Sequence, residues 1–244
     1  MDADIRTTYT DVTDMNLFES YNLRCEDAFV IYLPGNPSSQ KLLQRALASC
    51  KVVGQKATMW AGYDGTGKSI EPPPDEPSVM NAIKIKNHYL TRGEIACALS
   101  HISLWAKCIE EDRPIVILEH DAIMVKKYEY HSLYNSICYL GGREQYEGSM
   151  PILPTPPHAS DGPNFHSICR AHAYAIDPAV ARNMLAYVIQ HGINNSLDFI
   201  LRADLFNIHQ MGLFAYDSPD GTTIPNRSDD GNKFLKERND SLNT

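Results

Sequence analysis

Two carboxylates that could bind a cation, Glu119 and Asp121, flank His120 directly after the apolar run 115–118. Such a run predicts a strand buried on both faces. In open α/β sheets, ligands bind at the carboxyl ends of strands. Carboxylates at positions i and i+2 could there hold a hard divalent cation, which would neutralise a diphosphate. On spacing alone, an ordinary turn with two solvated acids is the favoured interpretation.

A second candidate is the segment 62–69, Gly-Tyr-Asp-Gly-Thr-Gly-Lys-Ser, which fits the P-loop pattern G-x-x-x-x-G-K-[ST]. A P-loop requires a helix that starts at its lysine, because the helix N-terminus and the loop amides bind the phosphates together. Here Ser69 is followed by Ile-Glu-Pro-Pro-Pro, and this run cannot continue a helix. A nucleotide-binding P-loop therefore stays as an alternative, while a glycine-rich loop is expected.

The strongest helix in the sequence is predicted to begin at Thr91. Thr91 and Glu94 form a T-x-x-E capping box, which gives Glu94 a structural role. Arg92 lies at the positive end of the helix dipole, where a bound anion would account for it. Cys97 and His101 are four residues apart, which alone is weak evidence for a metal site. The residues that would form the buried stripe of this helix are Ile95, Leu99, Ile102, Trp105 and Ile109.

Strands and helices alternate along most of the chain. This order predicts an α/β fold of Rossmann type, with a mainly parallel sheet flanked by helices in a single domain. We expect a polar N-terminal arm over 1–25, the domain over 26–217 and a flexible tail over 218–244. Further strands are predicted at 28–33, 57–61 and 171–176, helices at 38–49, 126–139, 178–191 and 195–205, and a long loop at 62–88.

The composition is that of a globular protein, with 43% hydrophobic and 21% charged residues. The sequence contains no run of 18 apolar residues, so no membrane span is expected. The N-terminus lacks the features of a secretory signal. Six cysteines without a C-x-x-C pair indicate reduced thiols, so we expect a cytoplasmic protein, in the host cytoplasm if the source is viral. The net charge of -8 argues against nonspecific binding to nucleic acids. A local basic patch could still be formed by Lys84, Lys86, Lys126, Lys127 and Arg143.

Three segments, taken in order, resemble glycosyltransferase family 25, which includes lipooligosaccharide and procollagen galactosyltransferases. Residues 90–105 (LTRGEIACALSHISLW) resemble the family's G-E-x-x-C-x-x-S-H-x-x-x-W helix. Residues 114–122 (PIVILEHDA) resemble its apolar strand followed by E-D-D-A, except that His120 replaces the middle acid. Residues 171–185 are similar to the later A-Y-x-I…A-x-x-L block, and 196–198 match a family acid more loosely.

The resemblance covers about residues 27 to 216 and implies a GT-A fold with a nucleotide-sugar donor, a UDP-sugar above all. It implies Mn²⁺ or Mg²⁺ at Glu119 and Asp121, with His209 as a later ligand, and transfer of a hexose or pentose with inversion. Asp121 would act through the metal, and Asp198 would take the proton from the acceptor hydroxyl. The residues expected on the donor side are Tyr32, Asp64, Gly65, Arg92, Glu94, Ser100, His101 and His120.

The acceptor is the part of the reaction that the sequence leaves open. A saccharide, a hydroxylated protein side chain and a hydroxymethylated DNA base all offer a hydroxyl group. The oligomeric state is equally open. The replacement at His120 also leaves a catalytically inactive relative that only binds sugar as an alternative.

Overall fold

The computed structural model describes residues 25–73, 79–87, 89–128, 135–142, 149–151 and 171–218 of the 244-residue chain. The predicted arm and tail therefore lie almost wholly outside the described residues, as do Arg143 and Cys169. The five cysteines within them, Cys25, Cys50, Cys97, Cys108 and Cys138, are free thiols. Among the described residues, no helix combines the length and the hydropathy that crossing a membrane requires.

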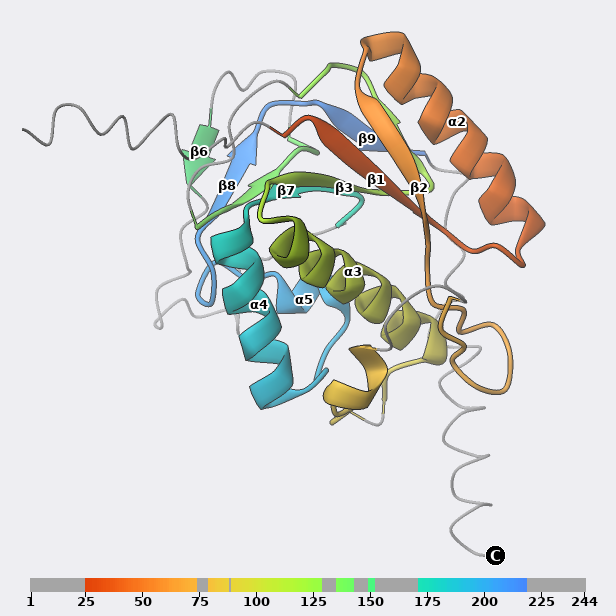
Figure 1. Cartoon of the computed structure of the whole chain (residues 1–244), viewed down its shortest axis with the longest axis vertical. Helices are drawn as coiled ribbons and strands as arrows, with labels where there is room; N and C mark the ends of the chain where they lie inside the picture. The colour runs from red at the N-terminus through yellow and green to blue at the C-terminus, as the bar shows by residue number, and fades with distance from the viewer. Residues whose placement is uncertain are drawn as a thin grey trace, which may run out of the picture.

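The predicted α/β architecture is confirmed (Figure 1). The described strands form a seven-stranded sheet of order β2-β1-β3-β7-β5-β8-β6 and a two-stranded sheet of β4 and β9. The strands are β1 (Asp27–Tyr32), β2 (Lys56–Ala61), β3 (Ile115–Glu119), β4 (Ala122–Met124), β5 (Ile137–Tyr139), β6 (Ser149–Pro151), β7 (Ala173–Ile176), β8 (Ile208–Met211) and β9 (Ala215–Asp217). The helices are α2 (Pro37–Val53), the 3₁₀ turn η2 (Val79–Ala82), α3 (Arg92–Glu111), α4 (Pro178–His191) and α5 (Leu197–Ile200).

The larger sheet is mixed in its strand directions. The pairs β1–β2, β1–β3 and β5–β8 are parallel, whereas β3–β7, β5–β7 and β6–β8 are antiparallel. The parallel half carries the Rossmann-like part of the fold, because β1, β2 and β3 are joined by crossovers that contain α2 and α3. The carboxyl ends of these three strands therefore meet at one edge of the sheet.

Helices cover both faces of the sheet, and each face has its own core. Figure 1 shows α3, α4 and α5 on one side of the sheet and α2 on the other. Along β3 the side chains alternate, so that Ile115 and Ile117 pack on the α3 side while Val116 and Leu118 pack on the α2 side. Trp105 of α3 is completely buried in the first of these cores. The apolar run before Glu119 is thus buried on both faces, as its composition predicts.

Helix α3 begins where the sequence predicts, because its capping box forms in full. Thr91 accepts a hydrogen bond from the Glu94 amide at 3.1 Å, and Glu94 accepts one from the Thr91 amide at 2.9 Å. These two bonds satisfy amides that the first helical turn cannot pair internally. The helix ends at Asp112, whose backbone is left-handed with a φ of 47°.

Two predicted helices are wrong over part of their length. Within 126–139, Ile137–Tyr139 form the strand β5, and Lys126–Tyr128 are not helical. Three residues buried between two neighbouring strands show neither alternation nor helical periodicity, so their pairing could not be recognised. Within 195–205, only Leu197–Ile200 form a helix. The chain then turns, and the Arg202 guanidinium pairs with the Asp204 carboxylate at 2.8 Å.

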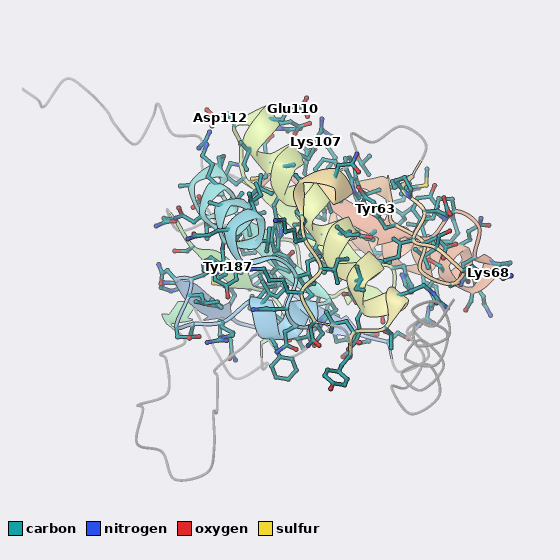
Figure 2. All side chains as sticks on the ribbon, turned by 90° about the horizontal axis from the view of Figure 1, so that it is seen from below. Tyr63, Lys68, Lys107, Glu110, Asp112 and Tyr187 are labelled. Carbon is teal, nitrogen blue, oxygen red and sulfur yellow. The ribbon has the colours of Figure 1, made fainter. Side chains whose placement is uncertain are left out.

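The glycine-rich loop after β2 is fixed by its own hydrogen bonds rather than by a helix. Asp64 and Glu71 exchange two backbone hydrogen bonds of 3.0 Å, and the Asp64 side chain accepts from the Thr66 amide at 2.8 Å. No helix begins at Lys68 within the described residues 62–73, and Lys68 projects at the periphery of the molecule (Figure 2). The geometry that a P-loop requires is therefore missing at this segment.

Replacing Gly65 by alanine is expected to lower the free energy of unfolding by about 1–3 kcal/mol, because the loop packs closely on α3. A Cβ at Gly65 would lie 2.5 Å from the Arg92 carbonyl oxygen. Gly67→Ala is the matched control, since its Cβ would meet nothing nearer than 3.8 Å. Urea denaturation of both variants measures the difference. Equal stability of the two variants would show that the loop does not pack on α3 as described.

Candidate functional site

The candidate site lies at the carboxyl end of β3, on the sheet face that α3 covers. Glu119 is the last residue of β3, and its amide donates a hydrogen bond of 2.8 Å to the carbonyl oxygen of His172, just before β7. The pairing of Ile117 with Tyr174 sets the register that brings these strands to the same level. Asp121 follows in the turn that leads into β4.

A buried chain of hydrogen bonds fixes the Glu119 carboxylate. Its Oε1 atom lies 3.3 Å from His101 Nε2 and 3.8 Å from Cys97 Sγ, both on α3. His101 Nδ1 lies 2.8 Å from the Tyr174 hydroxyl oxygen, which also accepts from Trp105 Nε1 at 3.0 Å. The side chains of His101, Trp105 and Tyr174 are almost fully buried, so Glu119 is held against a rigid surface.

The environment of Glu119 favours its ionised form. Burial alone would raise the pKa of this carboxyl, but the hydrogen bond from His101 and the charges of His101, His120 and His172 bring it below its ordinary value. His120 and His172 therefore contribute to the site through charge. Glu119 is consequently a carboxylate at neutral pH.

Asp121 has the opposite environment. Burial, followed by the negative charge of Glu119 and then that of Asp217, raises the pKa of Asp121 to about 7. Its Oδ1 atom is buried and has no hydrogen-bond partner among the residues that the structure describes. A buried carboxylate oxygen of this kind needs a proton or a cation to compensate its charge.

Asp198 on α5 lies near Cys97, because its negative charge contributes to the raised pKa of the Cys97 thiol. Its Oδ1 atom accepts a hydrogen bond of 3.0 Å from the Ala171 amide. The pKa of the Cys97 thiol lies well above its ordinary value because of burial and the charges of Glu119, Asp198 and Asp121. The neighbouring acids Glu119 and Asp121 and the distant Asp198 thus all act on Cys97 through their charges.

Asp217 is a further acid of this site that the sequence analysis missed. The pairing of β4 with β9 places Asp217 opposite Ala122, next to Asp121. The Ser218 amide donates a hydrogen bond of 2.9 Å to the Asp121 carbonyl oxygen. The Arg45 guanidinium donates one of 3.1 Å to the Ser218 hydroxyl oxygen. Only the antiparallel pairing of these three-residue strands reveals the contact, and strands this short leave no periodic pattern in the sequence.

Two of the expected donor-side residues have structural partners. Ser100 Oγ accepts a hydrogen bond from the Tyr63 amide at 2.8 Å and donates one to the Ala96 carbonyl oxygen at 2.7 Å, so it fastens the glycine-rich loop to α3. Glu94 is engaged in the capping box with Thr91. These contacts account for both residues without a ligand.

Four other expected donor-side residues lie together around the start of α3. The Tyr32 carbonyl oxygen, at the end of β1, accepts a hydrogen bond from the Gly62 amide at 2.8 Å. Gly65 contacts the backbone of Arg92, the first residue of α3. The Asp64 side chain lies next to Gly35, because a Cβ added to Gly35 would be 3.9 Å from Asp64 Oδ2. The loop after β1 thus contacts the loop after β2, which packs on the N-terminus of α3.

His209, the expected later metal ligand, is not brought to Glu119. It lies on β8 in register with Cys138, and Cys138 packs in the core on the α2 side. Its neighbour Ile208 packs on the α3 side, so the His209 side chain faces away from that side. Its Nδ1 atom is buried and finds no hydrogen-bond partner in the described ranges, and burial lowers the pKa of the ring.

Asp121→Asn is expected to stabilise the metal-free protein near neutral pH. Because the folded pKa is raised, the contribution of the wild-type carboxyl to stability is full only below about 4 and is lost as the pH rises to about 7. The asparagine has no such dependence, so its advantage should grow over this range. Urea denaturation with a chelator at several pH values measures it.

Asp204→Asn is the control with the opposite sign, because the hydrogen bond from Arg202 lowers the pKa of Asp204. This variant should lose a small amount of stability at neutral pH. If Asp121→Asn were instead destabilising at every pH, this result would show that burial and like charges do not destabilise the Asp121 carboxylate.

The comparisons with known proteins bear on the segment that carries most of this site. The family model of glycosyltransferase family 25 (LPS biosynthesis protein) matches residues 61–140. The match spans the glycine-rich loop, α3, β3 and the turn that holds Asp121. A search of curated proteins finds no match. Residues 61–140 therefore carry the pattern of glycosyltransferase family 25, which confirms the resemblance over this segment of the chain.

Proposed function

We propose that this protein is a metal-dependent glycosyltransferase that moves a sugar from a UDP-sugar to an acceptor hydroxyl with inversion. The observation that carries the proposal is the gathering of Glu119, Asp121 and Asp198 at the carboxyl end of β3. The family match over the same segment supports sugar transfer as the type of reaction.

The residues around Asp121 fit a hard divalent cation. Asp121 offers a buried carboxylate oxygen that accepts no hydrogen bond within the described part of the chain, and Glu119 and Asp217 add negative charge next to it. Carboxylate oxygens are the donors that Mn²⁺ and Mg²⁺ prefer. We propose that Asp121 and Glu119 hold the ion, and that Asp217, rather than His209, is the third ligand. When bound, Mn²⁺ or Mg²⁺ would stabilise the negative charge that develops on the leaving diphosphate.

The donor would bind beside the loop after β2, which contacts the loop after β1 and packs on α3. The N-terminus of a helix attracts anions, and Arg92 adds a positive charge at the first turn of α3. Gly65 keeps the loop close to this turn. We assign Tyr32 and Asp64, which lie on the same two loops, to the donor side as well.

Asp198 is proposed as the base. The Ala171 amide orients its carboxylate through Oδ1. During attack on the anomeric carbon, the acceptor hydroxyl would pass its proton to Asp198. Because one displacement is involved, the configuration at the anomeric carbon inverts, and no side chain of the enzyme is glycosylated.

Asp121→Asn is expected to lower kcat/KM for the UDP-sugar by at least about 100-fold, because a ligand of the charge-stabilising ion is lost. Asp198→Asn should lower kcat by a similar factor of about 100 or more, with little change in donor KM. The measurement is UDP release from a panel of UDP-sugars and acceptors with Mn²⁺, repeated with a chelator. Asp204→Asn, an acid outside the site, should keep wild-type activity.

Three kinds of result would count against this proposal. Full activity of Asp121→Asn, or activity that survives the chelator, would refute the metal assignment. If no donor turns over, a sugar-binding relative without catalysis becomes the better account. Loss of nucleotide affinity in Lys68→Ala would favour the P-loop alternative, although this segment lacks the required helix.

The acceptor is proposed only as a chemical class, a molecule that presents a free hydroxyl group. A saccharide, a hydroxylated protein side chain and a hydroxymethylated DNA base belong to this class. Mass spectrometry of glycans, protein and DNA from cells with and without the enzyme would identify the acceptor, and it would show a mass increase of one hexose or pentose. A cytoplasmic location stays a prediction.

A further inference from the structure

We propose that Cys97, His101 and Glu119 form a binding site for a thiophilic divalent cation such as Zn²⁺. This site differs from the hard-cation site at Asp121, although the two share Glu119. Cys97 Sγ, His101 Nε2 and a Glu119 carboxylate oxygen all lie within 4.8 Å of one another. Sequence spacing indicates only the weak pair Cys97 and His101, because Glu119 joins the cluster through the packing of β3 on α3.

The distances between the ligand atoms suit a tetrahedral ion. Bonds of about 2.0–2.1 Å to nitrogen and oxygen and about 2.3 Å to sulfur place tetrahedral ligands about 3.3–3.6 Å apart. The observed separations are 3.3 Å from His101 Nε2 to Glu119 Oε1 and 3.8 Å from Cys97 Sγ to the same oxygen. Cys97 and His101 are four residues apart on α3, so successive turns present them on one face. The third separation, from Cys97 Sγ to His101 Nε2, is within 4.8 Å, so these two atoms need to approach each other by at most about 1.3 Å to bind an ion.

The second nitrogen of His101 is already held in the way that metal-binding histidines require. Nδ1 lies 2.8 Å from the Tyr174 hydroxyl oxygen, and the two rings stack with centroids 5.6 Å apart. Trp105 donates a hydrogen bond to the same hydroxyl oxygen. Such partners fix the ring orientation and turn the other nitrogen toward the ion. In the metal-bound form, the His101 proton would be on Nδ1, directed at Tyr174.

The donor set determines which ion is preferred. Sulfur and imidazole nitrogen favour Zn²⁺ over Mg²⁺ or Mn²⁺. Binding would replace the contacts of Cys97 and His101 with Glu119 by bonds to the ion. The thiol proton would leave for solvent, and the proton on His101 Nε2 would leave that atom, with a proton kept on Nδ1. Cys97 and Glu119 are partly exposed, whereas His101 is buried, so the ion can approach from the open side. Three protein ligands leave a fourth position for water.

The experiment is a Co²⁺ titration of the reduced, full-length protein, followed by displacement with Zn²⁺. We expect one Co²⁺ per chain with a thiolate-to-metal charge-transfer band and the intense visible bands of a tetrahedral ion. Cys97→Ser should remove the charge-transfer band and weaken binding by at least about 10-fold. Cys108→Ser is the matched control on the same helix, because Cys108 lies eleven residues after Cys97 and its thiol contacts the Arg113 and Ile176 carbonyl oxygens instead of Glu119.

The proposal is overturned if the wild-type protein shows no thiolate band, or if Cys97→Ser retains it. Circular dichroism of each variant establishes that the fold is kept. His101→Asn gives a second readout, since it should weaken Co²⁺ binding while leaving Cys97 in place. None of these results depends on catalysis, so failure of the sugar-transfer assay would not affect them. If the proposed function also holds, Zn²⁺ should inhibit the Mn²⁺-dependent reaction through Glu119, and less strongly in Cys97→Ser.

Discussion

The contact between Glu119 and His101 is the interaction on which the candidate site depends. It holds a carboxylate at the end of β3 against the buried face of α3. Burying carboxylates is costly unless hydrogen bonds or opposite charges compensate them. His101, His120 and His172 compensate Glu119, but Asp121 faces the like charges of Glu119 and Asp217. The site therefore carries excess negative charge next to the place where the donor diphosphate is proposed to bind.

The fold brings these groups together through the parallel half of the sheet. Because β1, β2 and β3 run in the same direction, the segments that follow them meet at one edge. The capping box starts α3 at this edge, and Ser100 and Gly65 hold the glycine-rich loop against it. The antiparallel strands β7 and β9 then add His172 and Asp217 from the later part of the chain.

Elements with long periodic patterns could be predicted from the sequence, and short or paired elements could not. The stripe of α3, its capping box and the apolar run of β3 depend on local residues, and the structure contains all three. β5 and β9 have three residues each, and their place depends on partners far away in the chain. The side to which His209 points follows from the register of β8, which no local pattern encodes. A family motif also does not separate residues that touch a ligand from residues such as Ser100 that hold a loop.

The most direct test of the central claim is a measurement of Mn²⁺ binding by calorimetry, with and without UDP, on the wild-type protein and on Asp121→Asn. The account predicts that one Mn²⁺ binds per chain, that UDP strengthens this binding, and that the variant loses both effects while it stays folded. Mn²⁺ binding that is absent from the wild-type protein, or unchanged in Asp121→Asn, would contradict the account.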